Sequence, residues 1–474
     1  MRIVFVASEA FPLAKIGGLA DVTSSLALAL QESGHEPCLM LPAYGSIKAP
    51  LQDVPGKSVT VSFTGRQEQV NLKTTGLKGR VPVYLLENDR YFGRGGIYDR
   101  DELERFLFFT RVVPEVIAEL DLRPDIVHCH DWHTSLVLLW LKHAGMAVPG
   151  VYTIHNLAYQ GPFDRQFLLR SGLASVWQKY VPAGAPRPEM NFMSQGILLA
   201  DIVTTVSPTY ASEILTRQYG EGLEPLLSYR RNELCGIVNG IDYDEYNPAA
   251  DAHLARNYDS TTLETRTENK LALQRQSGLP PDPEMALFGM VSRLEEQKGI
   301  DLLLQTIDSF MAETKAQLVI LGRGREHYHR SLAEAALKYP HRLSVFITYD
   351  EGLARLIYAG SDVFLMPSRF EPCGLGQLMA MRYGAVPLVR RTGGLADTVH
   401  DVTEAGGNGF VFQDYDVREM LSAARRAERG FHHRSQWQDL MRRNMELDFS
   451  WRASAGRYEG VYLRAHSKGQ PSGS

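Results

Sequence analysis

Residues 368–399 read SRFEPCGLGQLMAMRYGAVPLVRRTGGLADTV, and this stretch decides how the chain is expected to fold. A short apolar run at 362–366 precedes it and has the length of a buried strand. Glu371 therefore follows the carboxyl end of one predicted strand, while Gly393 and Gly394 follow the next strand and open a helix. Ligands of open parallel sheets bind at such strand ends, and N–H groups at a glycine-rich helix start suit phosphate. The stretch therefore predicts a site for a phosphorylated sugar.

The glycine-rich pattern occurs a second time near the amino terminus. The sequence Gly-Gly-Leu-Ala-Asp of residues 393–397 recurs at 17–21, directly after Lys15 and Ile16. Each copy follows a predicted strand and precedes a helical pattern. Coincidence is one interpretation, because all of these residue types are common. The other is a pair of related domains of alternating strands and helices, each offering a glycine-rich helix start to one ligand.

Composition limits the class of protein. A chain of 474 residues is long for one domain, so two or three domains are expected. The net charge of −5 argues against general binding to nucleic acid or to an anionic membrane. The four cysteines are scattered and predict neither a disulfide framework nor a zinc knuckle. We expect a cytoplasmic protein, because no segment resembles a signal peptide or a membrane span.

Strand and helix patterns alternate along most of the chain. Apolar strand patterns at 2–7, 36–41, 125–129, 150–154, 202–206 and 236–238 are separated by helical patterns, which is typical of a mainly parallel sheet. Short alternating segments between 54 and 86 predict a β-rich excursion. The polar segment 239–283 is the predicted domain boundary, and alternation starts again at 287–291.

Two cations follow the predicted strand at 287–291. Arg293 offers a planar fork of donors and Lys298 a point charge, and both suit phosphate oxygens. The alternative is that both are solvated side chains next to Glu295 and Glu296. The glycine pair in the same half of the chain favours the phosphate interpretation.

A histidine-rich segment at 128–133 also contains Asp131. A metal site is disfavoured, because His133 falls where the chain turns into a helix and no further ligand has matching spacing. His155 and Asn156 end the neighbouring predicted strand. We interpret His155 as a candidate for substrate contact or for stabilising a cation; a structural histidine bonded to a carbonyl is the alternative.

These features together are typical of sugar transfer from a nucleotide diphosphate. Fixed cations and N–H groups can stabilise the leaving diphosphate, and nearby carbonyls or carboxylates can stabilise an oxocarbenium-like sugar. No metal ion or cofactor needs to be invoked. Cys373, beside Glu371, has no His or Asp partner nearby in sequence, so a packing role is favoured over that of a nucleophile.

The motifs, taken in order from residue 1 to about 465, resemble those of bacterial glycogen synthase and plant starch synthase. They are KIGGLADV at 15–22, HDWH at 130–133, TIHN at 153–156, VNGID at 238–242, SRL at 292–294, QKG at 297–299, RFEPCGL at 369–375, TGGLADTV at 392–399 and DFSW at 448–451. Ile16 and Gly376 depart from the more usual residues. Met379 stands where many related enzymes have a second glutamate, so it is given no ribose-binding role.

The resemblance implies an α/β protein with the GT-B fold, in which two Rossmann-like domains with parallel sheets face a deep interdomain cleft. Residues 1–240, with a carboxy-terminal helix at 452–466, would form the acceptor-side domain. Residues 241–451 would bind the nucleotide sugar, and 467–474 would be a disordered tail. The implied activity transfers glucose from ADP-glucose to the non-reducing end of glycogen, an α-1,4-glucan, with retention of configuration.

The resemblance also implies roles for individual residues. Arg293 and Lys298 would hold the diphosphate, Glu371 the glucose hydroxyls, and the backbone carbonyl of His155 would support the developing cation. The implied catalytic residues are His155, Glu371, Lys298, Arg293 and Asp131. The implied substrate-binding residues are Lys15, Gly18, Asp21, Asn156, Asn239, Cys373, Gly374, Leu375, Gly393, Gly394 and Leu395, the last three through N–H groups on the distal phosphate.

Other functions remain open from the residues alone. Another GT-B nucleotide-sugar enzyme, such as a sucrose-forming transferase or an epimerase, is one, and a non-catalytic glucan-binding protein is another. A dinucleotide oxidoreductase is disfavoured, because Gly322 and Gly324 lack the third glycine of that motif. The residues do not distinguish ADP-glucose from UDP-glucose.

Overall fold

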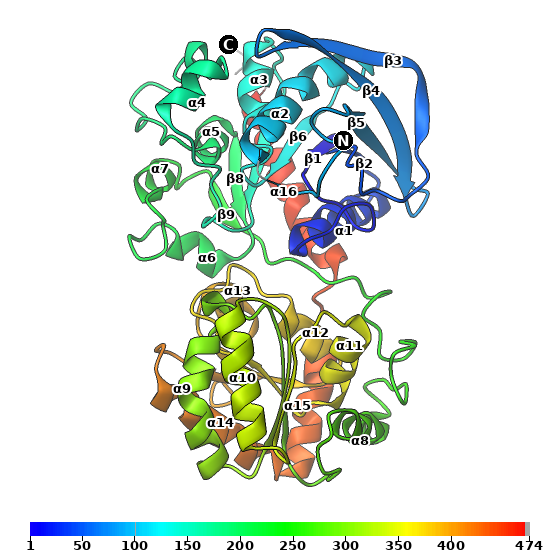
Figure 1. The fold of residues 1–474 in the computed structure, drawn as a ribbon, viewed down its shortest axis with the longest axis vertical. Coiled ribbons are helices and arrows are strands. Elements are labelled where there is room, and N and C mark those ends of the chain that lie inside the picture. The colour runs from blue at the N-terminus through cyan, green and yellow to red at the C-terminus, as the bar shows by residue number, and fades with distance from the viewer. Residues whose placement is uncertain (100, 470–474) are drawn as a thin grey trace. The chain divides into compact units, whose positions relative to one another are not determined.

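The computed structural model describes residues 1–99 and 101–469, which form two compact units (Figure 1). The first unit comprises Met1–Gly240 and the segment that starts at Trp451. The second unit is the continuous segment Ile241–Ser450.

The described residues of the first unit form a nine-stranded sheet in the order β3-β4-β5-β2-β1-β6-β7-β8-β9. Its strands are β1 (Arg2–Val6), β2 (Glu36–Pro42), β3 (Gln52–Phe63), β4 (Arg66–Leu77), β5 (Val81–Glu87), β6 (Ile126–His130), β7 (Gly150–Ile154), β8 (Ile202–Thr205) and β9 (Leu234–Gly236). The strand order reverses between β1 and β6, so the loops that follow these two strands meet at a topological switch point.

The sheet of the first unit is mainly parallel, as expected, with antiparallel pairing at one edge. The predicted β-rich excursion is a long hairpin, in which β3 pairs antiparallel with β4 and β4 pairs antiparallel with β5. Exposed and buried residues alternate along the end of β3, as they do in a strand with one solvated face. The parallel strand β1 is instead buried at every position after its first residue.

Helices of the first unit connect its strands. They are α1 (Gly18–Glu32), α2 (Glu102–Glu119), α3 (Val137–His143), α4 (Arg165–Arg170), α5 (Phe192–Leu199), α6 (Pro208–Glu213) and α7 (Glu224–Tyr229). The helix α16 (Trp451–Gly469) joins them from the far end of the sequence and places Tyr458 and Tyr462 in the same core as Ile3 and Phe5. This helix is longer than the expected 452–466, and an ion pair of 3.0 Å between Lys468 and Glu233 holds its last turn. Of the expected disordered tail, residues 467–469 are thus helical, and 470–474 lie outside the described residues.

The second unit contains a parallel sheet, six-stranded over the described residues, in the order β12-β11-β10-β13-β14-β15. Its strands are β10 (Leu287–Val291), β11 (Gln317–Leu321), β12 (Leu343–Phe346), β13 (Val363–Met366), β14 (Val386–Arg390) and β15 (Phe410–Phe412). Helices cover both faces (Figure 1): α8 (Arg266–Gln276), α9 (Ile300–Glu313), α10 (Glu326–Lys338), α11 (Glu351–Gly360), α12 (Gly376–Arg382), α13 (Gly393–Thr398), α14 (Val417–Phe431) and α15 (Arg434–Glu446). The strand order reverses between β10 and β13, which brings the loops after these strands together.

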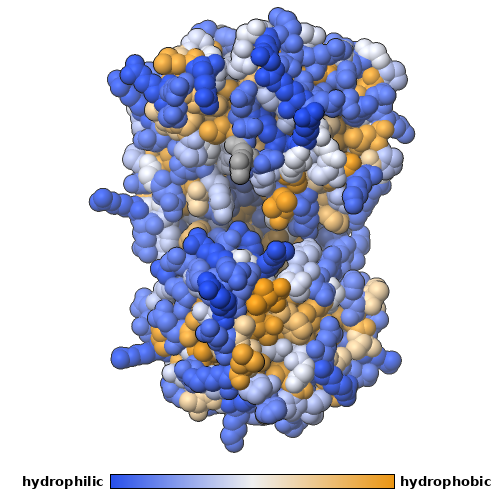
Figure 2. Space-filling model, in the orientation of Figure 1, coloured by the Kyte–Doolittle hydropathy of each residue, from blue (hydrophilic) through white to orange (hydrophobic). Residues whose placement is uncertain are grey.

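The face of the protein drawn in Figure 2 is predominantly polar. Figure 2 shows hydrophilic side chains over most of the face in view, with apolar residues between them. Among the described residues, no helix combines the length and the apolar character that crossing a membrane requires.

Candidate active site

The switch point of the second unit brings Lys298 and Glu371 together across 73 residues of sequence. The Lys298 ammonium donates to both carboxylate oxygens of Glu371, at 2.8 and 2.7 Å, and the Ser368 hydroxyl donates to one of them at 2.9 Å. Both charged side chains are largely buried, with 17% of Lys298 and 6% of Glu371 exposed. The two charges are therefore fixed relative to each other at the end of the sheet where ligands bind.

Arg293 lies on the same loop but has other partners. Its guanidinium contacts the carboxylate of Glu295 at 3.2 Å and the side-chain oxygen of Gln297 at 3.4 Å, and 51% of its side chain is exposed. An ion pair this exposed contributes about 0–1 kcal/mol, so an incoming phosphate can replace Glu295. Arg293 is thus a solvated side chain next to Glu295, as the alternative interpretation held, whereas Lys298 is largely buried on Glu371.

The paired glycines pack tightly against the loop that carries Glu371. A Cβ atom on Gly393 would lie 1.9 Å from the carbonyl oxygen of Glu371, and one on Gly394 would lie 2.0 Å from that of Cys373. The N–H of Gly394 donates to the carbonyls of Glu371 and Pro372, at 3.1 and 3.2 Å. These glycines therefore allow the start of α13 to approach the Glu371 loop.

Backbone hydrogen bonds occupy part of the helix start that is expected to hold the distal phosphate, and that role stays a prediction. The N–H groups of Gly394 and Leu395 are not bare, because the second donates to the carbonyl of Thr392 at 3.1 Å. The neighbouring turn is similar: Gly374 has a φ of +71° and Gly393 one of +44°, and neither α12 nor α13 has a side-chain cap. Both helix starts therefore lie next to Glu371 without a side-chain cap. Cys373 is 6% exposed, which agrees with a packing role.

In the first unit, Lys15 lies on the loop between β1 and α1. Its ammonium contacts the carboxylate of Asp21 at 2.8 Å and lies 5.0 Å from the centre of the Phe11 ring. Gly18 is the first residue of α1. The structure thus brings Lys15, Gly18 and Asp21 together, as the sequence predicts.

Asp131 follows β6 and has a φ of +55°, in the left-handed region that residues other than glycine rarely adopt. One of its carboxylate oxygens accepts the backbone N–H of His155 at 2.8 Å. Burial raises the pKa of Asp131 to about 7, although the N–H groups of His155 and Asn156 act in the opposite direction. The carboxylate therefore fixes the backbone of His155.

The raised pKa of Asp131 predicts that stability falls as pH rises. Its pKa is about 7 in the folded chain and has the ordinary value of 3.8 in the unfolded chain, so between these values the folded chain binds more protons. The Asp131→Asn variant keeps an oxygen that can accept the N–H of His155 and does not titrate. We expect urea unfolding at about pH 5 and about pH 8 to show a smaller loss of stability for this variant. An equal loss in both proteins would contradict the assignment.

The remaining predicted residues of the first unit lie after β7 and β9. The Nε2 atom of His155 lies 3.0 Å from Nδ1 of His130, and burial lowers the pKa of His155 to about 3. The side-chain oxygen of Asn156 accepts the N–H of Ala158 at 3.1 Å. Asn239 is 5% exposed, and its side-chain oxygen has no hydrogen-bond partner in the described part of the chain. Within residues 1–99 and 101–469, no cluster of three or more His, Cys, Asp or Glu side chains is arranged to hold a metal ion.

Comparisons with known proteins agree with this geometry. A family model described as the starch synthase catalytic domain matches residues 2–229, and one for glycosyl transferases group 1 matches residues 270–442. Glycogen synthase 2 of Geobacter sulfurreducens is 44% identical over 489 residues, covering 98% of this chain and 99% of that protein. The chain belongs to the family of bacterial glycogen synthases and starch synthases. The glycogen synthase of Gloeobacter violaceus is 45% identical over 475 residues, covering 98% of each chain.

A solved structure of this glycogen and starch synthase family has the same fold. The catalytic domain of starch synthase IV from Arabidopsis thaliana, bound to ADP and acarbose, matches with a TM-score of 0.90 and 34% identity over 98% of this chain and 99% of that chain. The expected GT-B fold is thereby confirmed, and the chain is a glycosyltransferase. Sucrose-phosphate synthase from Thermosynechococcus elongatus matches with a TM-score of 0.61 and 17% identity over 98% of this chain and 99% of that chain, which is a likeness of fold alone. The sucrose-forming alternative is therefore not favoured.

Two further residues, Glu9 and Gln377, hold the loops that carry the predicted site residues. The Glu9 carboxylate accepts the N–H groups of Ile16 and Gly17, at 2.6 and 2.9 Å, and also accepts the Tyr98 hydroxyl. The Gln377 amide donates to the carbonyls of Cys373 and Gly374, at 3.2 and 2.8 Å, so it braces the loop that follows Glu371. The signal that the sequence offered for Glu9 was a carboxylate close after the apolar run of the first strand.

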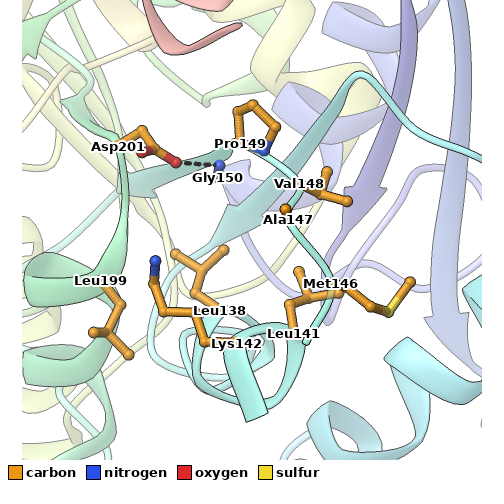
Figure 3. A pocket seen from close by; sticks show the side chains of 10 residues that line it. All are labelled: Leu138, Leu141, Lys142, Met146, Ala147, Val148, Pro149, Gly150, Leu199 and Asp201. Carbon is orange, nitrogen blue, oxygen red and sulfur yellow. Dashed lines mark hydrogen bonds between the residues drawn. The ribbon is translucent and has the colours of Figure 1, made fainter. Parts of the chain in front are cut away.

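A pocket in the first unit lies away from these residues. Figure 3 shows it at the amino-terminal end of β7, where the Asp201 carboxylate accepts the N–H of Gly150 at 2.7 Å. His155 follows the opposite, carboxyl end of the same strand. This pocket therefore does not belong to the candidate active site.

Proposed function

We propose that this chain elongates an α-1,4-glucan by transferring glucose from ADP-glucose to the non-reducing 4-hydroxyl, with retention of anomeric configuration. The observation that carries the proposal is the fixed contact between Lys298 and Glu371 at the switch point of the second unit. The family supports glucosyl transfer to glucan, and the ADP and acarbose bound by the related starch synthase support the choice of donor and acceptor.

The second unit supplies the groups that a nucleotide-sugar donor requires. Departure of ADP places negative charge on the diphosphate, and a cation fixed before the reaction stabilises that charge without reorganisation. Lys298 meets this requirement because its ammonium is held on Glu371. Arg293, with its exposed guanidinium, would close on the same diphosphate. We assign Gly374 and Leu375 to the phosphates at the start of α12, and Gly393 and Gly394 to the support of the Glu371 loop.

Glu371 and the first unit would act on the sugar. The Glu371 carboxylate can accept hydrogen bonds from glucose hydroxyls while it remains paired with Lys298. The carbonyl of His155 would support the oxocarbenium-like sugar, and Asp131 fixes that peptide through its hydrogen bond to the His155 N–H. Lys15 and Asp21, with the helix start at Gly18, would contact the donor from the first unit, and Asn156 and Asn239 would contact the sugars.

A donor comparison tests the proposal. Purified protein is incubated with glycogen and either ADP-glucose or UDP-glucose, and release of the nucleoside diphosphate is measured together with incorporation of labelled glucose. We expect ADP-glucose to be the better donor by kcat/KM, and the new linkages to be digested by an α-1,4-specific glucosidase. Equal use of UDP-glucose would overturn the donor assignment, and nucleotide release without incorporation into glycogen would overturn the acceptor assignment.

A further inference from the structure

His130 has no role in the proposed chemistry, yet its ring contacts the candidate catalytic histidine. It is the last residue of β6, its side chain is fully buried, and its Nδ1 atom lies 3.0 Å from Nε2 of His155. Its other nitrogen, Nε2, is enclosed and has no hydrogen-bond partner among the residues that the structure describes. Burial lowers the pKa of both rings, so both are neutral.

This geometry decides where the proton of each ring lies. Between two neutral imidazoles, one nitrogen donates and the other accepts. A proton on Nε2 of His130 would be a buried N–H without an acceptor, which is rarer and more costly than an unused lone pair. The neighbouring ring of Phe5 offers no acceptor either, because it is stacked at 5.7 Å and only 12° from parallel, with its face turned away from the in-plane N–H. The proton of His130 therefore belongs on Nδ1.

We propose that His130 is a positioning residue, which donates its Nδ1–H to Nε2 of His155 and so fixes the proton of His155 on Nδ1. The Nδ1 atom of His155 makes no hydrogen bond to the described residues and is not among their enclosed polar atoms. It is thus a neutral donor available to an oxygen of the transferred sugar. Asp131 holds the backbone N–H of the same residue, so two consecutive side chains fix His155 at two points. The statement that this donor faces substrate rests on the proposed function, whereas the assignment of the tautomer does not.

Nuclear magnetic resonance of the full chain labelled with ¹⁵N in histidine tests the tautomer directly. Two-bond ¹H–¹⁵N spectra show which ring nitrogen carries the proton, and the His155→Gln variant identifies the signals of His155. We expect His155 to be protonated on Nδ1 in the wild-type protein. Protonation on Nε2 would overturn the proposal without any activity measurement.

Two replacements of His130 separate positioning from packing. His130→Asn keeps an N–H close to the place of Nδ1, whereas His130→Leu fills the space and removes the donor. We expect the Asn variant to retain the Nδ1–H form of His155 and kcat within about threefold of the wild-type value, and the Leu variant to lose that form and about tenfold in kcat. An unchanged His155 spectrum in folded His130→Leu would overturn the proposal. If the Leu variant does not fold, loss of the Nδ1–H form in His130→Asn overturns it instead.

The same experiments distinguish this inference from the proposed function. If no glucose is transferred from ADP-glucose to glycogen, the proposed function fails, while the wild-type spectrum still tests the tautomer. If transfer occurs but His155 carries its proton on Nε2, only the inference about His130 fails.

Discussion

Replacing Lys298 by alanine is expected to lower kcat/KM about 10²–10³-fold, the loss that follows removal of one preorganised group that stabilises transition-state charge. The ammonium is held at 2.7–2.8 Å from both oxygens of Glu371, so the substitution removes a cation that is fixed at that place. The measurement is the initial rate of glucose incorporation into glycogen over a range of ADP-glucose concentrations. Retention of more than about a tenth of the wild-type kcat/KM would contradict the assigned role.

The Lys298→Ala variant needs a control for folding, because it leaves the buried carboxylate of Glu371 without its cation. Removing one partner of a buried ion pair costs about 3–5 kcal/mol of stability, so activity is compared only below the unfolding transition of each variant. Lys338→Ala is the matched control. Lys338 pairs with Asp308 at 2.8 Å, but 57% of its side chain is exposed. We expect that variant to change both activity and stability little.

Replacing Gly394 by alanine is expected to lower both activity and stability. The added Cβ would lie 2.0 Å from the carbonyl oxygen of Cys373, so the loop with Glu371 and the start of α13 must move apart. Overpacking of this kind costs about 1–3 kcal/mol. Displacement of Glu371 from Lys298 should lower kcat/KM by about 10²-fold, since small misplacements of catalytic groups have effects of that size. Urea unfolding and the glycogen assay measure the two effects.

The control for this variant is the same substitution elsewhere in a helix. Gly460 lies inside α16, and a Cβ atom there would meet nothing within 4 Å. Gly460→Ala should therefore raise the free energy of unfolding by up to about 1 kcal/mol and leave activity unchanged. Unaltered stability of Gly394→Ala would show that the Glu371 loop tolerates displacement, and that the contact between the two loops is not needed.

The parallel core of each sheet could be predicted from sequence, because each strand there is a short apolar run flanked by glycine or polar residues. The positions of Glu371 and Lys298 followed from that pattern, since both lie in the loops that follow the carboxyl ends of β13 and β10. The hairpin of β3 and β4 was predicted only as a β-rich segment, because residues with one solvated face give a weaker pattern. The predicted end of α16, at residue 466, falls short of the observed end at Gly469, and Lys468 in the last turn pairs with Glu233.

Contacts between distant loops could not be predicted. The N–H of Gly394 is engaged because the loop after β13 lies against it, and no local pattern indicates that approach. Glu9 meets Tyr98 across 89 residues, and His130 meets His155 across 25. In each case the residue type indicated that hydrogen bonds must form, but the partner depended on strand order.

The place of α16 in the core has a consequence for synthesis of the chain on the ribosome. Tyr458 and Tyr462 are fully buried with Phe5, and the Tyr462 hydroxyl lies 2.9 Å from Nδ1 of His128 in β6. The unit that contains the amino terminus is thus complete only once α16 is present, whereas Ile241–Ser450 is contiguous in sequence. We therefore expect Ile241–Ser450 to complete its fold before the unit that contains the amino terminus, which is the reverse of the usual order during translation.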